Sequence, residues 1–263
     1  MADQRPPASD EQSPIAEVAD SSRWRSVPGL IRSGETLPQP WADIFGALAR
    51  GKVDDLLVVA QCGQSLDGRV ATPSGHSHYI NGSAGLDHLH RLRAIMDAVV
   101  IGVGTVIADD PQLTVRHVAG PSPVRVVIDP RGTLPAGSRA FAADGVHRIV
   151  ITGRSCPSIN GGIETIALPD MDGRIEPAAI LDALQQRGLR RILVEGGAQT
   201  VSTFLAAGCL DRLHLTVAPM ILGAGVTGLD LPPTALRVPM RAHTLGSDVL
   251  FDCDLRSGET AAR

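Results

Sequence analysis

The sequence has few of the features that mark secreted, membrane-bound or nucleic-acid-binding proteins. Its four cysteines, Cys62, Cys156, Cys209 and Cys253, lie far apart and form no C-x-x-C pair, so we expect reduced thiols in a cytoplasmic protein. No apolar run approaches the roughly 18 residues of a membrane-spanning helix, and the N-terminus has no secretion-signal pattern. A formal net charge of -4 gives no basic surface for nucleic acid or an anionic membrane.

The chain does have enough residues for the core of one full-sized α/β domain, with 263 residues of which 43% are hydrophobic. We expect a flexible tail over 1–22, an N-terminal extension with a short helix over 23–53, and a main domain over 54–256. The tail is rich in Pro, Ser, Ala and acidic residues, so it cannot bury enough surface to offset the entropy of ordering. The helix is predicted within PQPWADIFGALARG, where four large residues share one packing face: Trp41, Ile44, Phe45 and Leu48.

From residue 54 onward, short apolar runs alternate with segments of helical period. Continuous runs such as Val124 to Ile128 predict strands buried on both faces, and therefore an α/β fold with a mainly parallel central sheet flanked by helices. The expected strands are 55–62, 98–102, 124–129, 148–152, 163–168 and 191–195, and the expected helices are 83–95, 177–187 and 198–207. After residue 210, DRLHLTVAP and DVLFDCDL have no long helix between them, which favours antiparallel C-terminal strands.

The residues that follow each strand are the first candidates for a site, because ligands of open α/β sheets bind beyond the carboxyl ends of the strands. In EGGAQT, Gly196 and Gly197 let the backbone approach a ligand, and the next helix offers unpaired N–H groups to a phosphate. A tight turn that caps the helix explains these glycines equally well. GVGTVI has Ile107 where a dinucleotide-binding fingerprint needs its third glycine, so the standard fingerprint is absent.

Arginines and carboxylates give weaker signals. Arg93 and Arg116 are of the type that binds phosphate bidentately, although single arginines are more often solvated. Asp109 and Asp110 precede Pro111, where a local turn is an equal explanation. No G-x-S-x-G elbow or catalytic-cysteine context is present, which argues against a hydrolase.

Four histidines, His76, His78, His88 and His90, cluster along the sequence. His88 and His90 are two residues apart on a predicted helix, so their side chains point in different directions. We therefore expect surface histidines and no metal site.

The ordered motifs are more specific than any one of them. SLDGRVATPSGHSHYI, RLRAIMDAVVIGVGTVIADDPQLTVR, VRVVIDPRG and RRILVEGGAQTVSTFLAAGCLDRLHLTVAPMILG together closely resemble the reductase domain of the riboflavin-biosynthesis deaminase/reductase family, from about Leu56 to Leu255. The resemblance implies a dihydrofolate-reductase-like fold, a homodimer, and an NADPH-dependent oxidoreductase. Its reaction would reduce the ribose of 5-amino-6-(5-phosphoribosylamino)uracil, or the closely related diaminopyrimidinone, to a ribityl chain.

The resemblance also implies roles for individual residues. Asp109 and Glu195 would be catalytic. Substrate contacts would come from Ser77, Arg93, Leu113, Arg116 and Glu195. Cofactor contacts would come from Gly63, Tyr79, Thr105, Asp109, Gly196, Gly197, Ala198, Gln199, Thr200 and Val201. From the residues themselves we add Arg154 in TGRS, with Thr152 or Ser155, as a holder of the 2′-phosphate of NADPH.

Two departures from the family qualify this expectation. The zinc-binding H-x-E and P-C-x-x-C motifs of the fused deaminase are absent, so deamination is not expected from a chain with the reductase part alone. Gln61 stands where the family commonly has Lys, which removes a cation from the pocket. The loop QSLDGRVATPSG, residues 64–75, is expected to lie across nicotinamide and substrate. A pterin or dihydrofolate-type reductase and a non-catalytic NADPH-binding protein remain alternatives.

Overall fold

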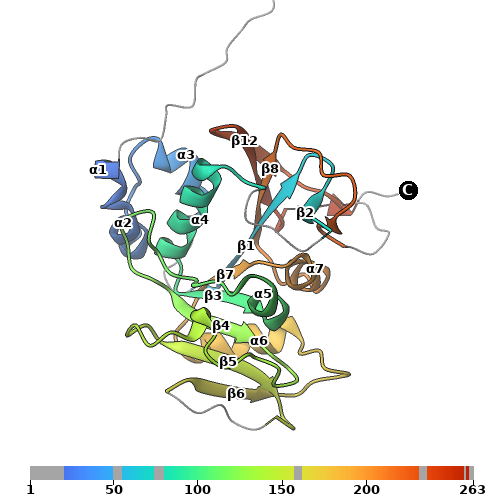
Figure 1. The fold of residues 1–263 in the computed structure, drawn as a ribbon. Helices are drawn as coiled ribbons and strands as arrows, with labels where there is room; N and C mark the ends of the chain where they lie inside the picture. The colour runs from blue at the N-terminus through green and yellow to red at the C-terminus, as the bar shows by residue number, and fades with distance from the viewer. Residues whose placement is uncertain are drawn as a thin grey trace, which may run out of the picture.

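The fold is a nine-stranded sheet with helices packed on both faces (Figure 1). The computed structural model describes residues 21–49, 55–73, 80–156, 162–230, 236–257 and 259–260. Along the sheet the strands follow the order β11-β12-β8-β1-β7-β3-β4-β5-β6. The neighbours from β8 through β6 are parallel, and β11, β12 and β8 pair antiparallel. This is the dihydrofolate-reductase-like α/β fold that the sequence predicts.

The strands of the large sheet have these bounds: β1 (Leu57–Ser65), β3 (Ala98–Gly102), β4 (Val124–Ile128), β5 (Arg148–Gly153), β6 (Glu164–Leu168), β7 (Arg191–Glu195), β8 (Arg212–Ala218), β11 (Met240–Leu245) and β12 (Asp248–Asp254). Two small sheets pair β2 (Arg69–Ala71) with β9 (Val226–Thr227) and β10 (Leu236–Arg237) with β13 (Glu259–Thr260). The helices are α1 (Ser21–Trp24), α2 (Val27–Ser33), α3 (Trp41–Ala49), α4 (Ser83–Ile95), α5 (Val103–Asp109), η1 (Arg139–Phe141), α6 (Pro177–Gln185) and α7 (Ala198–Ala206).

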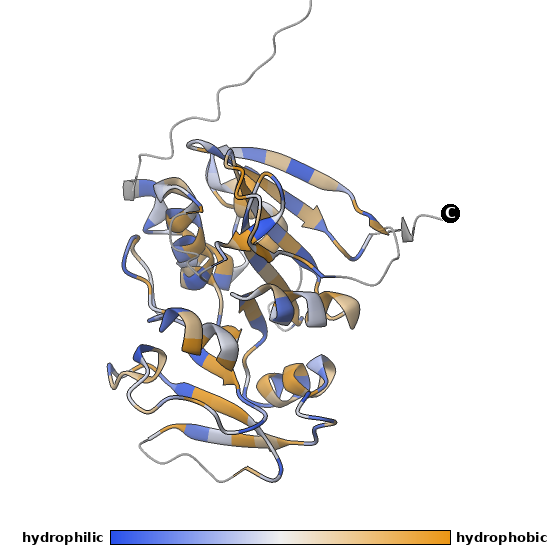
Figure 2. Ribbon diagram, turned by 45° about the vertical axis from the view of Figure 1, so that its right-hand side comes forward, coloured by the Kyte–Doolittle hydropathy of each residue, from blue (hydrophilic) through white to orange (hydrophobic). Residues whose placement is uncertain are grey.

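The central strands bury both faces, with alternate side chains entering two separate cores. On β1, Val59 packs with α1 to α5, whereas Val58 and Ala60 pack with α6 and α7. Val99 and Val100 of β3 divide between the two cores in the same way. Figure 2 shows apolar residues running through these strands. Burial on both faces of the sheet therefore explains why these strands are continuous runs of β-branched residues.

The strand β8 joins the parallel part of the sheet to its antiparallel part. It pairs antiparallel with β12, as expected, but parallel with β1 on its other side. The reason lies in the connections, because α7 carries the chain from β7 to β8 as a crossover, which gives parallel strands. The chain returns to the sheet at β11 without a long helix, and a hairpin then places β12 between β11 and β8, antiparallel to both.

The N-terminal extension contains more helix than the sequence indicates, since α1 and α2 precede the predicted α3. Helix α1 begins at Ser21, inside the segment expected to be a tail. Residues 1–20 lie outside the described part of the chain, and so does Gly51, the last residue of PQPWADIFGALARG. Trp24 and Trp41 are buried with ring centroids 5.0 Å apart. Trp24 also donates from Nε1 to the carbonyl oxygen of Ala119, at 2.7 Å. These helices therefore complete the core beside α4.

The expectation of surface histidines is wrong for His88 and His90, which are 1% and 2% exposed on α4. His88 stacks on Phe45 of the N-terminal extension and lies 3.0 Å from His214 between Nε2 and Nδ1. His90 stacks on His117. The aromatic partners come from other elements, so the local sequence could not reveal them. His76 and His78 lie outside the described residues.

Candidate active site

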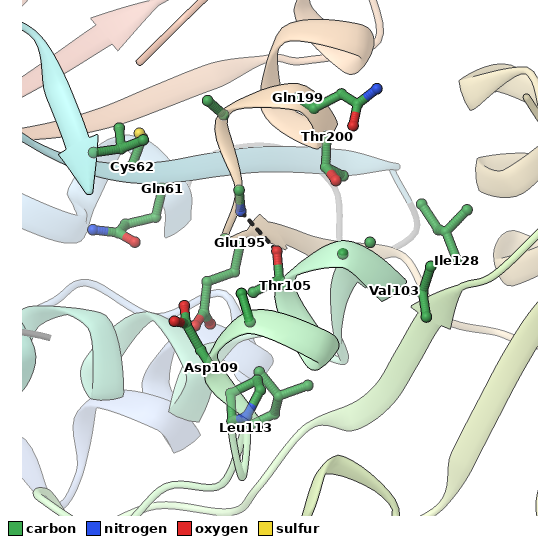
Figure 3. A pocket seen from close by; sticks show the side chains of 18 of the residues that line it. Gln61, Cys62, Val103, Thr105, Asp109, Leu113, Ile128, Glu195, Gln199 and Thr200 are labelled. Atoms are coloured by element: carbon green, nitrogen blue, oxygen red, sulfur yellow. Dashed lines mark hydrogen bonds between the residues drawn. The ribbon is translucent and has the colours of Figure 1, made fainter. Parts of the chain in front are cut away.

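A cavity of about 940 Å³ opens at the carboxyl ends of β1, β7, β3 and β4. Its volume lies at the upper end of the range for small-molecule sites. Three of the segments selected from the sequence line it, those after β1, β3 and β7, whereas TGRS after β5 does not. Residues within 128–139 and 172–175, which were not selected, also line it. Figure 3 views the cavity from close by.

Glycines let the strand exits of β3 and β7 pack together at the centre of the cavity. Gly196 has a φ of 99°, a conformation that side chains disfavour. A Cβ at Gly102 would lie 2.6 Å from Thr200 Oγ1, and one at Gly197 would lie 3.0 Å from Thr105 Oγ1. The amide of Gly197 donates to Thr105 Oγ1 at 3.0 Å (Figure 3). The start of α7 is therefore fixed beside the cavity. The amide of Thr200 already donates to the carbonyl oxygen of Gly197, at 3.0 Å, so Ala198 and Gln199 supply the first-turn amides of a cradle suited to phosphate.

Glu195 and Arg93 form a buried ion pair at the inner wall of the cavity. Arg93 Nε donates to Glu195 Oε2 at 2.8 Å, and Arg93 Nη2 donates to Oε1. A third bond runs from Arg93 Nη1 to the carbonyl oxygen of Thr114, at 3.1 Å. The two side chains are 5% and 9% exposed. The guanidinium expected to hold a phosphate instead holds Glu195, in the bidentate geometry that fixes a carboxylate most firmly.

Arg116 remains an exposed cation on the cavity wall. Its backbone amide donates to His90 Nδ1 at 3.2 Å. Partial burial and the charges of Arg93 and Arg139 lower the pKa of Arg116, whereas Glu195 acts in the opposite direction. Arg139 also lines the cavity, and sequence reasoning missed it, because its segment carries no motif and only the fold brings it near Arg116.

The loop from Asp109 to Arg116 adopts a constrained backbone. Asp110 and Leu113 have φ values of 39° and 57°, in a region that residues other than glycine adopt rarely. Leu113 is 1% exposed, and Asp110 Oδ1 accepts from the amide of Arg139 at 2.7 Å. Such backbone outliers concentrate at functional sites. Figure 3 shows Asp109 and Glu195 directing their carboxyl groups toward the same part of the cavity.

The predicted site residues divide into three groups. Ser77 and Tyr79 lie outside the described residues. Arg154 is exposed and is not among the described residues that line the cavity, while Thr152 and Val201 are fully buried. The cavity is lined by the others: Gly63, Arg93, Thr105, Asp109, Leu113, Arg116, Glu195, Gly196, Gly197, Ala198, Gln199 and Thr200.

The loop after β1 is only partly a wall of the cavity. Ser65 Oγ donates to Asp67 Oδ1 at 2.6 Å, and the amides of Leu222 and Gly223 also donate to Asp67. The bond from Ser65 and these amides lower the pKa of Asp67 to about 2. Asp67 thus holds a neighbouring turn rather than a ligand. In the described part of this loop, Val70 and Ala71 line the cavity.

Gln61 and Cys62 complete the wall on the β1 side. Gln61 is paired in register with Glu195 on β7 and is 8% exposed, so the two side chains leave the sheet on the same face. Burial raises the pKa of the Cys62 thiol to about 11, and a thiol in that state is a poor nucleophile.

The described residues hold no group of three or more His, Cys, Asp or Glu side chains arranged for a metal ion. In the same part of the chain, every helix is too short or too polar to cross a membrane.

The fold and the cavity define an α/β protein with a candidate ligand site where parallel strands end, at which the start of a helix lies beside a buried carboxylate. The chain belongs to the RibD C-terminal domain family, whose model matches residues 57–251.

Named relatives agree with this assignment. The chain is 31% identical over 208 residues to a 2,5-diamino-6-ribosylamino-4(3H)-pyrimidinone 5′-phosphate reductase of Methanothermobacter thermautotrophicus, covering 74% of this chain and 96% of that protein. It is 33% identical over 198 residues to the riboflavin biosynthesis protein RibD of Aquifex aeolicus, covering 72% of this chain but 54% of that longer protein.

Solved structures have the same fold. A deaminase/reductase from Thermotoga maritima matches with a TM-score of 0.65 and 28% identity, over 76% of this chain and 56% of that one. The riboflavin biosynthesis reductase Rib7 of Saccharomyces cerevisiae matches with a TM-score of 0.69 over 84% of this chain and 99% of that one. At 24% identity, the second match concerns the fold alone.

Proposed function

We propose that this protein is an NADPH-dependent oxidoreductase of riboflavin biosynthesis. Its substrate would be 5-amino-6-(5-phosphoribosylamino)uracil or the related diaminopyrimidinone, and its product the ribityl compound. Family membership and the names of the relatives support this reaction class. The observation that carries the proposal is that one cavity joins a glycine-built phosphate cradle to an Arg93-held carboxylate and an exposed arginine, Arg116. We also propose a homodimer, from the family resemblance, and a cytoplasmic location, from the wide spacing of the cysteines.

The residues present fit the cofactor. The close approach at Gly102, Gly196 and Gly197 leaves backbone where larger residues would project, and the start of α7 favours an anion. Bound there, NADPH would supply a hydride to C1′ of the substrate. Positioning then becomes the task of the protein, because near-attack contact between cofactor and substrate removes several kcal/mol of the barrier.

The substrate phosphate would bind at Arg116, with Arg139 as a second nearby cation. Arg93 already donates two hydrogen bonds to Glu195 and one to Thr114, so we assign it the role of positioning Glu195. Glu195 in turn would accept a hydrogen bond from the N–H edge of the pyrimidine. This arrangement fixes both ends of the substrate, the phosphate by an exposed cation and the ring by a buried carboxylate.

Reduction of an imine-like C1′ also requires a proton at the adjacent nitrogen. Both oxygens of Glu195 accept from Arg93, which suits Glu195 to orientation. We assign the proton-handling role to Asp109, which reaches the same part of the cavity from the end of α5 (Figure 3). Asp109→Asn should lower kcat and change the pH profile, with little effect on substrate KM.

The test is an assay of the purified protein with NADPH and a panel of pyrimidine phosphates and pterins. We expect NADPH oxidation with the phosphorylated pyrimidine and formation of the ribityl product. Oxidation only with a pterin would replace this proposal by the pterin or dihydrofolate alternative. Tight NADPH binding without turnover on any member of the panel would favour the non-catalytic alternative.

A further inference from the structure

The three N-terminal helices lie outside the part of the chain that the family model matches. Helices α1, α2 and α3 end at Ala49, whereas the model matches residues 57–251. In Figure 1 they lie beside α4. Their buried side chains join the core there: Trp24, Val27, Ile31, Trp41, Ile44, Phe45 and Leu48. These helices therefore belong to the folded domain, and the proposed reaction gives them no role.

Helix α4 separates the N-terminal helices from the cavity. One face of α4 lines the cavity, with Gly85, Leu86, Leu89, His90 and Arg93. On the other face, His88 stacks on Phe45 with ring centroids 5.3 Å apart. The guanidinium of Arg91 lies over Trp41 and Trp24, at 4.9 and 5.7 Å from the ring centroids. Side chains three or four positions apart share a helix face, so the N-terminal helices contact the face of α4 opposite to the ligand site.

The segment that carries Arg116 begins on the cavity side of α4. The carbonyl oxygen of Thr114 accepts from Arg93 Nη1, at 3.1 Å. The amide of Arg116 donates to His90 Nδ1, at 3.2 Å. Two residues of α4 thus hold the backbone on the N-terminal side of the Arg116 side chain.

Beyond Arg116 the chain forms a short loop at the surface. The amide of Val115 donates to Ser122 Oγ at 3.0 Å, which closes the loop at its base. The residues between them are exposed or half-buried, so burial contributes little to their order. Segments of this kind open locally at a low cost in free energy. The order of the loop therefore depends on its hydrogen bonds.

Trp24 fixes the middle of this loop. It is 1% exposed, and its Nε1 donates to the carbonyl oxygen of Ala119 at 2.7 Å. The next residue, Gly120, has a φ of 147°, and a Cβ there would lie 2.6 Å from Ala94 Cβ, so this position needs glycine. Pro28 Cγ of α2 is 3.7 Å from the same Cβ position. The loop is thus held at Ala119 and Gly120 by α4 together with the N-terminal helices.

The two tryptophans of the N-terminal helices differ in their hydrogen bonding. Trp24 and Trp41 are both buried, and both contact the guanidinium of Arg91. Trp41 Nε1 has no hydrogen-bond partner among the described residues, whereas Trp24 Nε1 donates to Ala119. Both rings therefore contribute packing, and Trp24 adds a hydrogen bond to the loop. This difference makes the two residues a matched pair for an experiment.

We propose that Trp24 is a positioning residue for substrate binding. Its hydrogen bond to Ala119 orders the loop from Val115 to Ser122, and the ordered loop presents Arg116 to the phosphate of the substrate. An arginine on an ordered backbone binds more tightly, because less conformational entropy is lost when the ligand binds. The inference rests on the proposed function, in which Arg116 holds that phosphate. It makes the N-terminal helices determinants of substrate affinity.

The test compares Trp24→Phe with the wild type, by calorimetric titration with ribose 5-phosphate and by kinetics with the phosphorylated and dephosphorylated pyrimidines. Phenylalanine keeps an aromatic ring beside Arg91 but cannot donate to Ala119. The affinity for ribose 5-phosphate should fall, and the KM for the phosphorylated pyrimidine should rise, by about three- to tenfold, the effect of one lost hydrogen bond. The kcat, the NADPH affinity and the turnover of the dephosphorylated pyrimidine should change little.

Two controls distinguish positioning from packing. Trp41→Phe makes the same change of ring but removes an N–H group without a described partner, so it should leave the phosphate affinity unchanged. In an Arg116→Ala background, Trp24→Phe should have no further effect on that affinity, because its hydrogen bond acts through Arg116. Equal weakening by Trp41→Phe, or a full effect of Trp24→Phe without Arg116, would overturn the inference.

Hydrogen exchange tests the same inference in the protein without ligand. The amides of Val115 and Arg116 are bonded to side chains, and they should exchange faster in Trp24→Phe than in the wild type or in Trp41→Phe. Unchanged exchange in Trp24→Phe would overturn the inference while leaving the proposed function in place. If the wild type used the phosphorylated pyrimidine no better than the dephosphorylated one, the proposed phosphate site itself would be wrong.

Discussion

The inner and outer ends of the cavity handle charge in opposite ways. At the inner end, Arg93 and Glu195 are buried and already paired with each other. At the outer end, Arg131 follows β4 and Arg174 follows β6, and both line the cavity. They are exposed, and no carboxylate in the described part of the chain forms an ion pair with them. A buried charge needs a partner before any ligand arrives, because its desolvation is costly, whereas an exposed cation is hydrated and exchanges water for a ligand. The inner pair thus determines geometry, and the outer arginines are available for binding.

The largest effect should come from breaking the inner pair. Arg93→Ala leaves Glu195 buried without its cation, so we expect a loss of about 3–5 kcal/mol in the free energy of unfolding, measured by urea denaturation. Turnover should fall as well, because the carboxylate loses its fixed position. Arg93→Lys keeps the charge but loses the bidentate guanidinium geometry. Relative to Arg93→Ala, it should restore stability more than turnover. If Arg93→Ala were as stable as the wild type, the buried ion pair at the inner end would not contribute to stability, and the contrast with the outer end would be wrong.

Replacing the exposed cation Arg116 should weaken substrate binding without lowering the stability of the fold. Arg116→Ala should lower kcat/KM for the phosphorylated pyrimidine at least tenfold, about 1.4 kcal/mol, with little change in stability or NADPH affinity. Glu195→Gln should lower the same quantity at least tenfold, but it also alters the buried pair and should cost stability. The dephosphorylated substrate is the control, since its turnover should be nearly insensitive to Arg116→Ala. Equal sensitivity of both substrates would show that Arg116 does not hold the phosphate.

The sequence predicted the parts of the site that depend on local chain geometry. Helix α4 and strand β3 have the predicted bounds, because hydrophobic period and turn residues are local signals. Gly196 and Gly197 were selected for their backbone freedom, which the φ of Gly196 and the contacts with Thr105 explain. Those features require no knowledge of which strands become neighbours.

The pairing of charges could not be predicted in this way. Arg93 and Glu195 are 102 positions apart, and only the adjacency of α4 to β7 decides that they bind each other rather than a phosphate. Arg139 belongs to a segment without a motif. Arg131 lies in the motif VRVVIDPRG, but nothing in that motif singles it out, and both arginines reach the cavity through long-range packing. The burial of His88 has the same origin, since Phe45 and His214 come from distant elements. Which side chains become partners thus depends on the order of the strands in the sheet. A single sequence contains little information about that order.

A smaller effect on the inner end should appear in the dependence of stability on pH. Burial, followed by the charges of Arg93, His117 and Arg116, lowers the pKa of His90 to about 3; burial and His214 also lower the pKa of His88. The unfolded chain therefore binds more protons below about pH 6.5, and stability falls as pH drops from there toward 3. Each such histidine contributes up to about 1.4 kcal/mol per pH unit.

His90→Asn tests this prediction, because the asparagine oxygen can replace Nδ1 as acceptor for the amide of Arg116 while removing the titrating group. Urea denaturation between pH 7 and pH 5 should give a shallower decline for the variant than for the wild type. The remaining decline should reflect His88. Parallel curves for the two proteins would mean that His90 takes up no proton on unfolding in this range.

The smallest effect concerns Arg139, which lies between the inner and the outer end of the cavity and could belong to either. It is exposed, and its charge acts on Arg116, so it should belong to the substrate end. An exposed cation contributes about 0.2–1 kcal/mol and is screened by salt. Arg139→Ala should therefore raise the KM for the phosphorylated pyrimidine by about two- to fivefold at low ionic strength. Affinity for NADPH should not change, whereas the opposite pattern would show that Arg139 contacts the cofactor. In the double variant with Arg116→Ala, the two effects should be less than additive, because both cations act on one phosphate.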